Sequence, residues 1–303
     1  YYGYSSPKKP SSIFKEDIQS GESDLVWQQL VSNYDESLYE VERLKINARD
    51  NTKVPISLVY KEGIDLKKAP ILVYGYGSYG IIIDAAFRTS ILPLLNRGFI
   101  FAVANIRGGS EMGRQWYDDG KILNKKNTFY DFIDATKSLI ENGYGDSKNV
   151  FAMGGSAGGL LMGAVINMEP ELYTGIISAV PFVDVLTTMS DESIPLTTFE
   201  YKEWGNPANK EEYDYIKSYS PYDNIQPSNY PAVLVTSSLY DSQVQYYEPA
   251  KYVPKLRENS TSDNPILMKM NLVGGHAGKS GRLNALEESA LDNTFLINLV
   301  SND

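Results

Sequence analysis

The segment Gly-Gly-Ser-Ala-Gly at residues 154–158 matches the pattern G-x-S-x-G. The apolar run at 150–153 predicts a buried strand before it, and the longer apolar stretch at 160–168 predicts a helix after it. A strand, a sharp glycine turn and a helix are the setting in which this pattern marks a nucleophilic serine. The helix start would also offer free backbone N–H groups to a developing oxyanion. We therefore predict Ser156 as the nucleophile; the alternative is a glycine-rich turn that happens to contain a serine.

His276 is the only histidine in the chain, so no second candidate exists for a histidine base. Imidazole suits the task of taking the serine proton because its pKa lies near working pH. The residue stands in the glycine-rich segment Gly-Gly-His-Ala-Gly-Lys at 274–279 rather than on an apolar face. This position favours a catalytic histidine over one packed in a core.

Two acids compete to orient that histidine and to stabilise its charged form. Asp241 follows a predicted strand at 232–237, and Asp184 follows one at 175–183. Both positions are geometrically possible. The polar loop around Asp241 favours that residue, because functional side chains gather on such loops.

An oxyanion needs two hydrogen-bond donors. One would be the backbone N–H of Ala157, directly after the nucleophile. The other should come from the loop after the predicted strand at 70–74, where Tyr-Gly-Tyr-Gly stands in place of a His-Gly-Gly motif. A tyrosine hydroxyl can donate instead, and Tyr76 is better placed than Tyr74; the alternative is that both rings only pack. For Arg107, positioning of a substrate loop and a structural ion pair remain equally open.

The elements that must position these residues alternate between strands and helices. The strands are apolar throughout, which is typical of a parallel sheet covered on both faces. We predict an α/β-hydrolase fold, with a mostly parallel sheet, helices on both faces and an antiparallel hairpin at the start. Strands are expected at 42–48, 54–60, 70–74, 99–105, 150–153, 175–183, 232–237 and 265–273, and helices at 85–97, 128–142, 160–168, 247–258 and 283–300.

Composition narrows the class of protein. The chain has 303 residues, 42% of them hydrophobic, and a net charge of −10, which argues against binding to nucleic acid or to an anionic membrane. The absence of cysteine excludes disulfides, thiol catalysis and cysteine-ligated metal, and with one histidine a transition-metal site would need carboxylates alone. We expect no metal and no cofactor. No secretory signal and no apolar run of membrane-spanning length is visible, and we expect a cytoplasmic protein.

Residues 1–40 differ from the rest. Two short strand-like runs at 12–18 and 24–30 flank a plausible hairpin turn, and their antiparallel character is distinct from the alternating strands and helices of residues 41–303. We interpret residues 1–40 as the tail of a separate β module.

Several stretches in fixed order resemble the prolyl oligopeptidase family of serine peptidases, over essentially all of residues 40–303. They are Tyr-Gly-Tyr-Gly-Ser-Tyr-Gly at 74–80, Arg-Gly-Gly at 107–109, Gly-Gly-Ser-Ala-Gly-Gly-Leu at 154–160, Tyr-Ser-Pro-Tyr-Asp-Asn at 219–224 and Gly-His-Ala-Gly-Lys at 275–279. Three more, at 181–185, 203–207 and 241–246, are similar to oligopeptidase B, the branch that cuts after Arg or Lys. The resemblance implies a triad of Ser156, Asp241 and His276, with Tyr76 and the Ala157 N–H as oxyanion donors.

The resemblance also implies a basic-residue specificity. Glu200 stands where prolyl-specific members have a tryptophan, and a carboxylate there would pair with an Arg or Lys side chain at P1, the residue before the cleaved bond. Lys202 replaces a second acid that this branch often has, and Glu203 is the candidate substitute. Tyr79 and Arg107 are further candidates for substrate contact.

Members of the family have a seven-bladed β-propeller, for which this chain has no room. The resemblance implies that residues 1–40 are a remnant of the last propeller blade and its linker, and that residues 41–303 are the catalytic domain. We expect a fragment, or one piece of a split protein, to which the missing module is supplied in trans. Short peptides with basic residues are the expected substrates. The alternatives are a prolyl-specific oligopeptidase, an esterase or acyl hydrolase on the same site, and a non-catalytic binding module.

Overall fold

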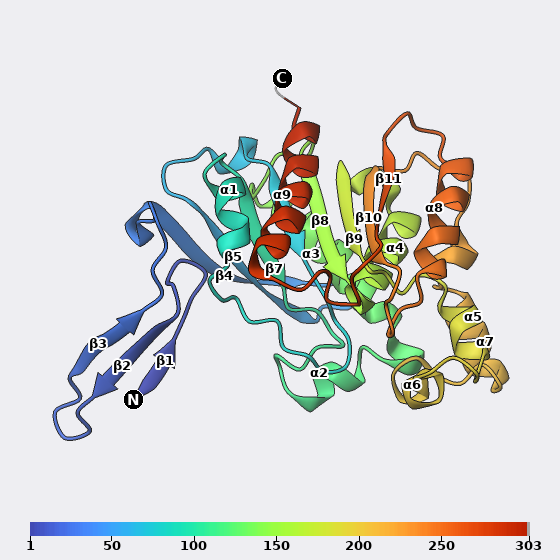
Figure 1. Ribbon diagram of the computed structural model, residues 1–303, viewed down its shortest axis with the longest axis horizontal. Coiled ribbons are helices and arrows are strands. Elements are labelled where there is room, and N and C mark those ends of the chain that lie inside the picture. The colour runs from blue at the N-terminus through green and yellow to red at the C-terminus, as the bar shows by residue number, and fades with distance from the viewer. Residues whose placement is uncertain (302–303) are drawn as a thin grey trace.

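A computed structural model describes residues 1–301, apart from the side chain of Arg282, and its centre is an eight-stranded sheet (Figure 1). The strands lie in the order β11-β10-β9-β8-β6-β7-β5-β4. Their bounds are β4 (Tyr39–Asn47), β5 (Lys53–Lys61), β6 (Ile71–Tyr74), β7 (Ile100–Ala104), β8 (Val150–Gly155), β9 (Gly175–Ala179), β10 (Ala232–Ser238) and β11 (Ile266–Asn271). Strands β6 to β11 run parallel to one another, while β4 and β5 form an antiparallel hairpin, of which β5 pairs antiparallel with β7. The predicted α/β-hydrolase sheet is confirmed.

Helices cover both faces of the sheet. Helices α1 (Leu92–Leu95) and α9 (Arg282–Leu299) lie on one face, in front in Figure 1. Helices α3 (Lys126–Glu141), α4 (Ala157–Met168) and α8 (Tyr247–Asn259) pack on the other. Each layer encloses its own apolar core, because the central strands are buried on both sides and alternate side chains point to opposite faces.

The predicted helix at 85–97 is shorter than expected. A 3₁₀ turn at Thr89–Ile91 leads into α1, which ends at Leu95. Proline in the first turn explains the late start, since its ring fits the beginning of a helix better than the middle.

Several short elements were not predicted at all. They are the helices α2 (Arg114–Asp118), α5 (Val185–Ser190), α6 (Thr197–Trp204) and α7 (Lys210–Lys217) and the 3₁₀ turns η1 (Glu36–Leu38), η2 (Leu66–Lys68), η4 (Ile122–Asn124), η5 (Pro170–Leu172) and η6 (Tyr222–Asn224). Helices α5, α6 and α7 lie between β9 and β10 in the chain, and α6 is part of the site.

A second, small sheet precedes the first. Strands β1 (Tyr2–Tyr4), β2 (Ser12–Glu16) and β3 (Ser23–Gln28) pair antiparallel and project away from the main body (Figure 1). Its apolar side chains are unusually open, with Trp27 51% exposed. Within residues 1–301, no helix has both the length and the apolar character needed to cross a membrane.

Candidate active site

Ser156 occupies the sharp turn between β8 and α4. Its backbone is left-handed, with φ of 57°, and its N–H donates to the Ala179 carbonyl at 2.8 Å. The turn is too tight for a side chain at Gly154, where a Cβ would come within 2.3 Å of the Gly158 oxygen. Although Ser156 is the N-cap of α4, its hydroxyl makes no capping bond, so Oγ is left available for chemistry.

The two predicted oxyanion donors lie beside this serine. Ala157 is the first residue of α4, where backbone N–H groups have no partner within the helix. The parallel register pairs Tyr74 with Met153, so the chain leaves β6 next to the point where it leaves β8. Burial raises the pKa of Tyr76 to about 12, against the effect of a hydrogen bond with the Ser156 side chain. The Tyr76 hydroxyl therefore keeps its proton at neutral pH and can donate it to an oxyanion.

Of the two tyrosines weighed from the sequence, only Tyr76 faces the site. Tyr74 packs against the core under α1 and α9, with the Arg88 guanidinium 4.8 Å above its ring. Tyr76 lines a cavity of about 240 Å³ that Ser156 and Ala157 also line.

Asp241 and His276 are paired. The His276 Nδ1 atom lies 2.7 Å from Oδ2 of Asp241, whose side chain is fully buried. The other carboxylate oxygen accepts the backbone N–H groups of Gln243 and Val244, both at 2.9 Å. Burial would raise the pKa of Asp241, but these hydrogen bonds outweigh it and hold the pKa below its usual value. The carboxylate is thus fixed as an acceptor for the histidine ring.

His276 lines a second cavity, of about 510 Å³, together with residues at the ends of β10 and β11. Within the described residues no hydrogen bond joins its ring to Ser156 Oγ. Catalytic hydrogen bonds are often long in the absence of substrate and tighten when it binds.

Glu200 forms part of the wall of the Ser156 cavity. Its Oε2 atom accepts the Tyr79 hydroxyl at 2.8 Å and the Trp204 indole N–H at 2.9 Å. Within residues 1–301 no hydrogen bond or ion pair is made by Oε1. Lys202, on the same helix, is exposed and is not part of the cavity wall. The site therefore combines a serine, the two predicted oxyanion donors and one carboxylate with a single bonded oxygen.

Glu203 is not available to a ligand in the way that the sequence suggested. It is 3% exposed, and both of its oxygens are occupied: Oε1 accepts the Tyr79 backbone N–H at 2.8 Å, and Oε2 accepts the Tyr117 hydroxyl at 2.6 Å. The candidate substitute for a second acid thus binds protein groups instead.

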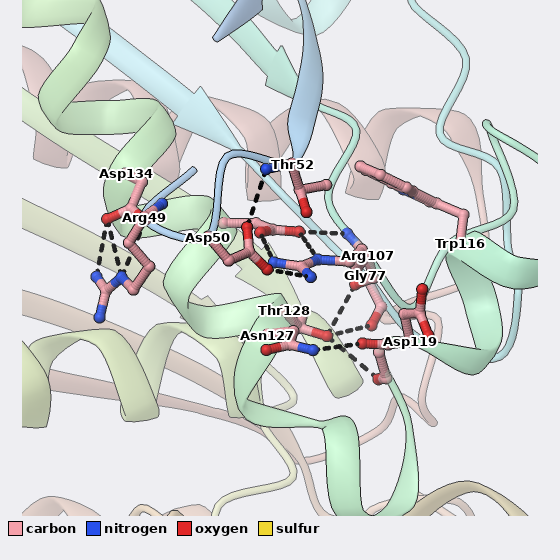
Figure 2. Close-up of polar contacts among 12 residues, drawn as sticks. Arg49, Asp50, Thr52, Gly77, Arg107, Trp116, Asp119, Asn127, Thr128 and Asp134 are labelled. Carbon is pink, nitrogen blue, oxygen red and sulfur yellow. Dashed lines mark hydrogen bonds and ion pairs between the residues drawn. The ribbon is translucent and has the colours of Figure 1, made fainter. Parts of the chain in front are cut away.

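Arg107 lies in a buried ion-pair cluster (Figure 2). Its Nε and Nη2 atoms bind both oxygens of Asp131 at 2.8 and 2.6 Å, and Nη1 binds Asp50 at 2.7 Å. The residue is 5% exposed and does not line the Ser156 cavity. The sequence left two interpretations of Arg107 open, positioning of a substrate loop and a structural ion pair. The structure shows the ion pair.

Sequence reasoning missed Trp204 as a site residue. The signal was present, because Glu200 and Trp204 are four residues apart and would share a face of a helix; the helix itself was not predicted. Within the part of the chain that the structure describes, no cluster of three or more His, Cys, Asp or Glu side chains could hold a metal ion.

Comparison with known proteins relates this chain to peptidases. Residues 85–302 match the prolyl oligopeptidase family. The chain is 52% identical to dipeptidyl aminopeptidase BI of Pseudoxanthomonas mexicana, over 98% of this chain and 41% of that protein, and 50% identical to Protease 2 of Moraxella lacunata, over 97% and 43%. Oligopeptidase B from Leishmania major superposes with a TM-score of 0.94 at 45% identity, covering 98% of this chain and 42% of that one. The chain therefore spans about two fifths of the length of these relatives.

Proposed function

We propose that this chain, which belongs to the prolyl oligopeptidase family of serine peptidases, hydrolyses short peptides after Arg or Lys. The observation that supports this proposal is Glu200, whose carboxylate lies in the wall of the cavity that holds Ser156. A guanidinium or ammonium at P1 would pair with its free oxygen, while a proline ring would gain nothing from it.

The reaction would follow the serine-peptidase scheme. Ser156 Oγ attacks the P1 carbonyl carbon as His276 Nε2 takes the hydroxyl proton, and Asp241 stabilises the charged ring. The Ala157 N–H and the Tyr76 hydroxyl hold the oxyanion. The peptide C–N bond then breaks as His276 gives the proton to the leaving amine. Water, deprotonated by the same histidine, releases the acid product from the acyl-enzyme and restores the serine.

The test uses chromogenic peptides that differ only at P1, with Arg, Lys, Pro or Phe. We expect kcat/KM to be highest for Arg and Lys, to be lost in Ser156→Ala, and to fall for Arg and Lys alone in Glu200→Gln. Glu192→Gln is the matched control, because Glu192 is exposed and binds Tyr201 without lining the cavity. A preference for Pro would favour a prolyl-specific oligopeptidase, and cleavage of simple esters without amide cleavage would favour an acyl hydrolase.

Residues 1–38 belong, in this proposal, to an adjoining β module such as the family's propeller, whereas Tyr39 and Glu40 are part of β4 in the main sheet. The small sheet shares no strand with the main one, and its apolar side chains are exposed as if for a further partner. Limited proteolysis between Gln28 and Tyr39 should leave the remainder resistant; rapid loss of the main sheet on that cut would contradict the division.

A further inference from the structure

The segment of residues 75–80, called here the 75–80 loop, contains two groups that the proposed function needs. Tyr76 would donate to the oxyanion, and the Tyr79 hydroxyl binds Glu200. Its backbone is strained, because Tyr79 has φ of 61°, which a residue with a side chain rarely adopts. Gly77 also has positive φ, and a Cβ there would come within 2.4 Å of Thr128. Such a conformation persists only where the surroundings hold it.

Lys125, at the start of α3, holds the first half of the loop. It is 1% exposed, and its ammonium donates to the Gly77 carbonyl at 2.6 Å, to Ser78 Oγ at 2.8 Å and to the Gly120 carbonyl at 3.2 Å. Thr128, one turn further along α3, also reaches this carbonyl, but at 3.4 Å (Figure 2); the nearest acceptor of its hydroxyl is the Arg107 carbonyl, at 2.8 Å. The carbonyl of Gly77, the residue after Tyr76, is therefore held mainly by the buried Lys125 ammonium.

Burying an ammonium group that is not bonded to a carboxylate costs free energy. The buried Lys125 ammonium therefore points to a specific role at this position. Burial lowers the pKa of Lys125 to about 8, although the nearby Glu203 carboxylate acts in the opposite direction. The ammonium also lies 5.0 Å above the ring of Trp204, the residue that donates to Glu200.

Glu203 holds the second half of the loop. Its bond to the Tyr79 N–H fixes the residue at the strained position, and the Tyr117 hydroxyl fixes Glu203 in turn. Through the Tyr79 hydroxyl this restraint reaches Oε2 of Glu200.

We infer that Lys125 and Glu203 are positioning residues with separate tasks: Lys125 sets the oxyanion donor Tyr76, and Glu203 sets the carboxylate Glu200 that faces the P1 cation. The inference rests on the proposed function for the identity of that cation. Neither residue lines the cavity of Ser156.

Two measurements on the full-length protein separate the tasks. Inactivation by an alkyl fluorophosphonate, which forms an O–P bond with the serine as fluoride leaves, depends on the oxyanion donors but not on a P1 cation. Binding of benzamidine, a small amidinium, reports on Glu200 alone. We expect Lys125→Met to slow inactivation about 10-fold, a part of what loss of a whole oxyanion donor costs, while the benzamidine Kd changes less than about 3-fold.

Glu203→Leu should show the reverse pattern. We expect the benzamidine Kd to rise about 10-fold, which is the scale of one lost hydrogen bond to a charged group, with little change in the inactivation rate. Glu203→Gln keeps a carbonyl oxygen for the Tyr79 N–H and should restore binding. The matched controls are Lys126→Met and Glu212→Gln, because these residues bind Tyr215 and Asn206 and do not contact the loop.

A double-mutant cycle distinguishes positioning from general destabilisation. Lys125→Met should cost little further in a Tyr76→Phe background, since the group it positions is gone. If Lys125→Met fails to fold, Ser78→Ala removes one acceptor of the ammonium and should slow inactivation by a smaller factor. The inference would be overturned if Lys125→Met left the inactivation rate unchanged. It would also be overturned if Lys125→Met and Glu203→Leu each weakened inactivation and benzamidine binding to the same extent. If the parent does not bind benzamidine, the basic specificity and the task of Glu203 fail together, while the inactivation rates still decide the task of Lys125.

Discussion

The Tyr79 hydroxyl donates a 2.8 Å hydrogen bond to Oε2 of Glu200, 121 residues further along the chain. The bond joins the loop after β6 to helix α6, and Glu200 lines the cavity of Ser156. The proposed oxyanion donor Tyr76 and the residue that binds the proposed P1 carboxylate, Tyr79, therefore stand on one loop.

Replacement of Tyr79 by Phe removes this bond without removing the ring. We expect KM for a P1-Arg peptide to rise about 3- to 10-fold, in line with one hydrogen bond to a charged group, with kcat nearly unchanged. Steady-state kinetics on the peptide series measures it. Tyr201→Phe, which loses only a contact with exposed Glu192, should match the parent. A fall in kcat at constant KM would contradict the assigned role.

Tyr76→Phe should act on the chemical step. Loss of one of the two oxyanion donors is expected to lower kcat about 100-fold while KM stays close to the parent value. Tyr74→Phe is the control, since Tyr74 packs under α1 and α9 instead of facing the cavity. Equal effects of the two substitutions would refute the assignment of Tyr76.

The ion-pair cluster of Arg107 predicts a large stability difference between two neighbouring acids on α3. Asp131 is fully buried, so Asp131→Ala would leave a buried guanidinium short of its partner and should cost about 3–5 kcal/mol of unfolding free energy. Asp134 pairs with half-exposed Arg49 and also accepts the Arg49 backbone N–H at 2.7 Å, so Asp134→Ala should cost about 1–2 kcal/mol, less than Asp131→Ala. Urea denaturation of both variants compares them directly. Similar losses would mean that burial does not set the strength of the Arg107 pair.

Glu248 makes stability depend on pH. It is fully buried and accepts the Asp184 N–H at 3.0 Å and the Thr188 hydroxyl at 2.7 Å. Burial raises the pKa of this carboxyl to about 7, despite these hydrogen bonds. A folded-state pKa above the unfolded one contributes stability below the unfolded pKa, and that contribution is lost as pH rises through 7.

Glu248→Gln removes this titration. We expect the variant to match the parent near pH 4.5 and to exceed it by up to about 3 kcal/mol at pH 8, since each pKa unit is worth about 1.4 kcal/mol. Thermal and urea unfolding across pH measure the difference. Thr188→Val loses the same hydrogen bond without a titrating group, so its offset from the parent should not vary in the same way. The prediction would be wrong if the difference in unfolding free energy between Glu248→Gln and the parent did not change with pH.

Much of the fold could be predicted from the sequence, because apolar strands and amphipathic helices are visible as local periodicity. The central strands β6, β7 and β8 are examples, and all three were expected. The helices around the site were not, since α5, α6 and α7 are short and pack against one another and against the turn η4. Resemblance to the family therefore points to Glu200, whereas local periodicity does not place it on a helix.

The sequence could not show which residues, distant along the chain, would bind Arg107 and Glu203. The choice between a substrate contact and an ion pair for Arg107 depended on Asp50 and Asp131, which lie 57 and 24 residues away. Glu203 looked like an open acid because its two donors, Tyr79 and Tyr117, come from far earlier in the chain. The residue types predicted the charges of Arg107 and Glu203 correctly, but they did not predict the groups that each side chain binds.

The strand order also places the residues of the proposed site in parts of the sheet that differ in their resistance to local unfolding. Ser156 and Tyr76 follow β8 and β6, which are neighbours in the middle of the sheet, whereas His276 follows β11, an edge strand paired with β10 alone. Edges open more readily than centres in the native state. Amide hydrogens of β11 should then exchange with solvent before those of β6 and β8. Peptidase activity should disappear at urea concentrations where most of the sheet still resists exchange, so that the catalyst fails before the protein does.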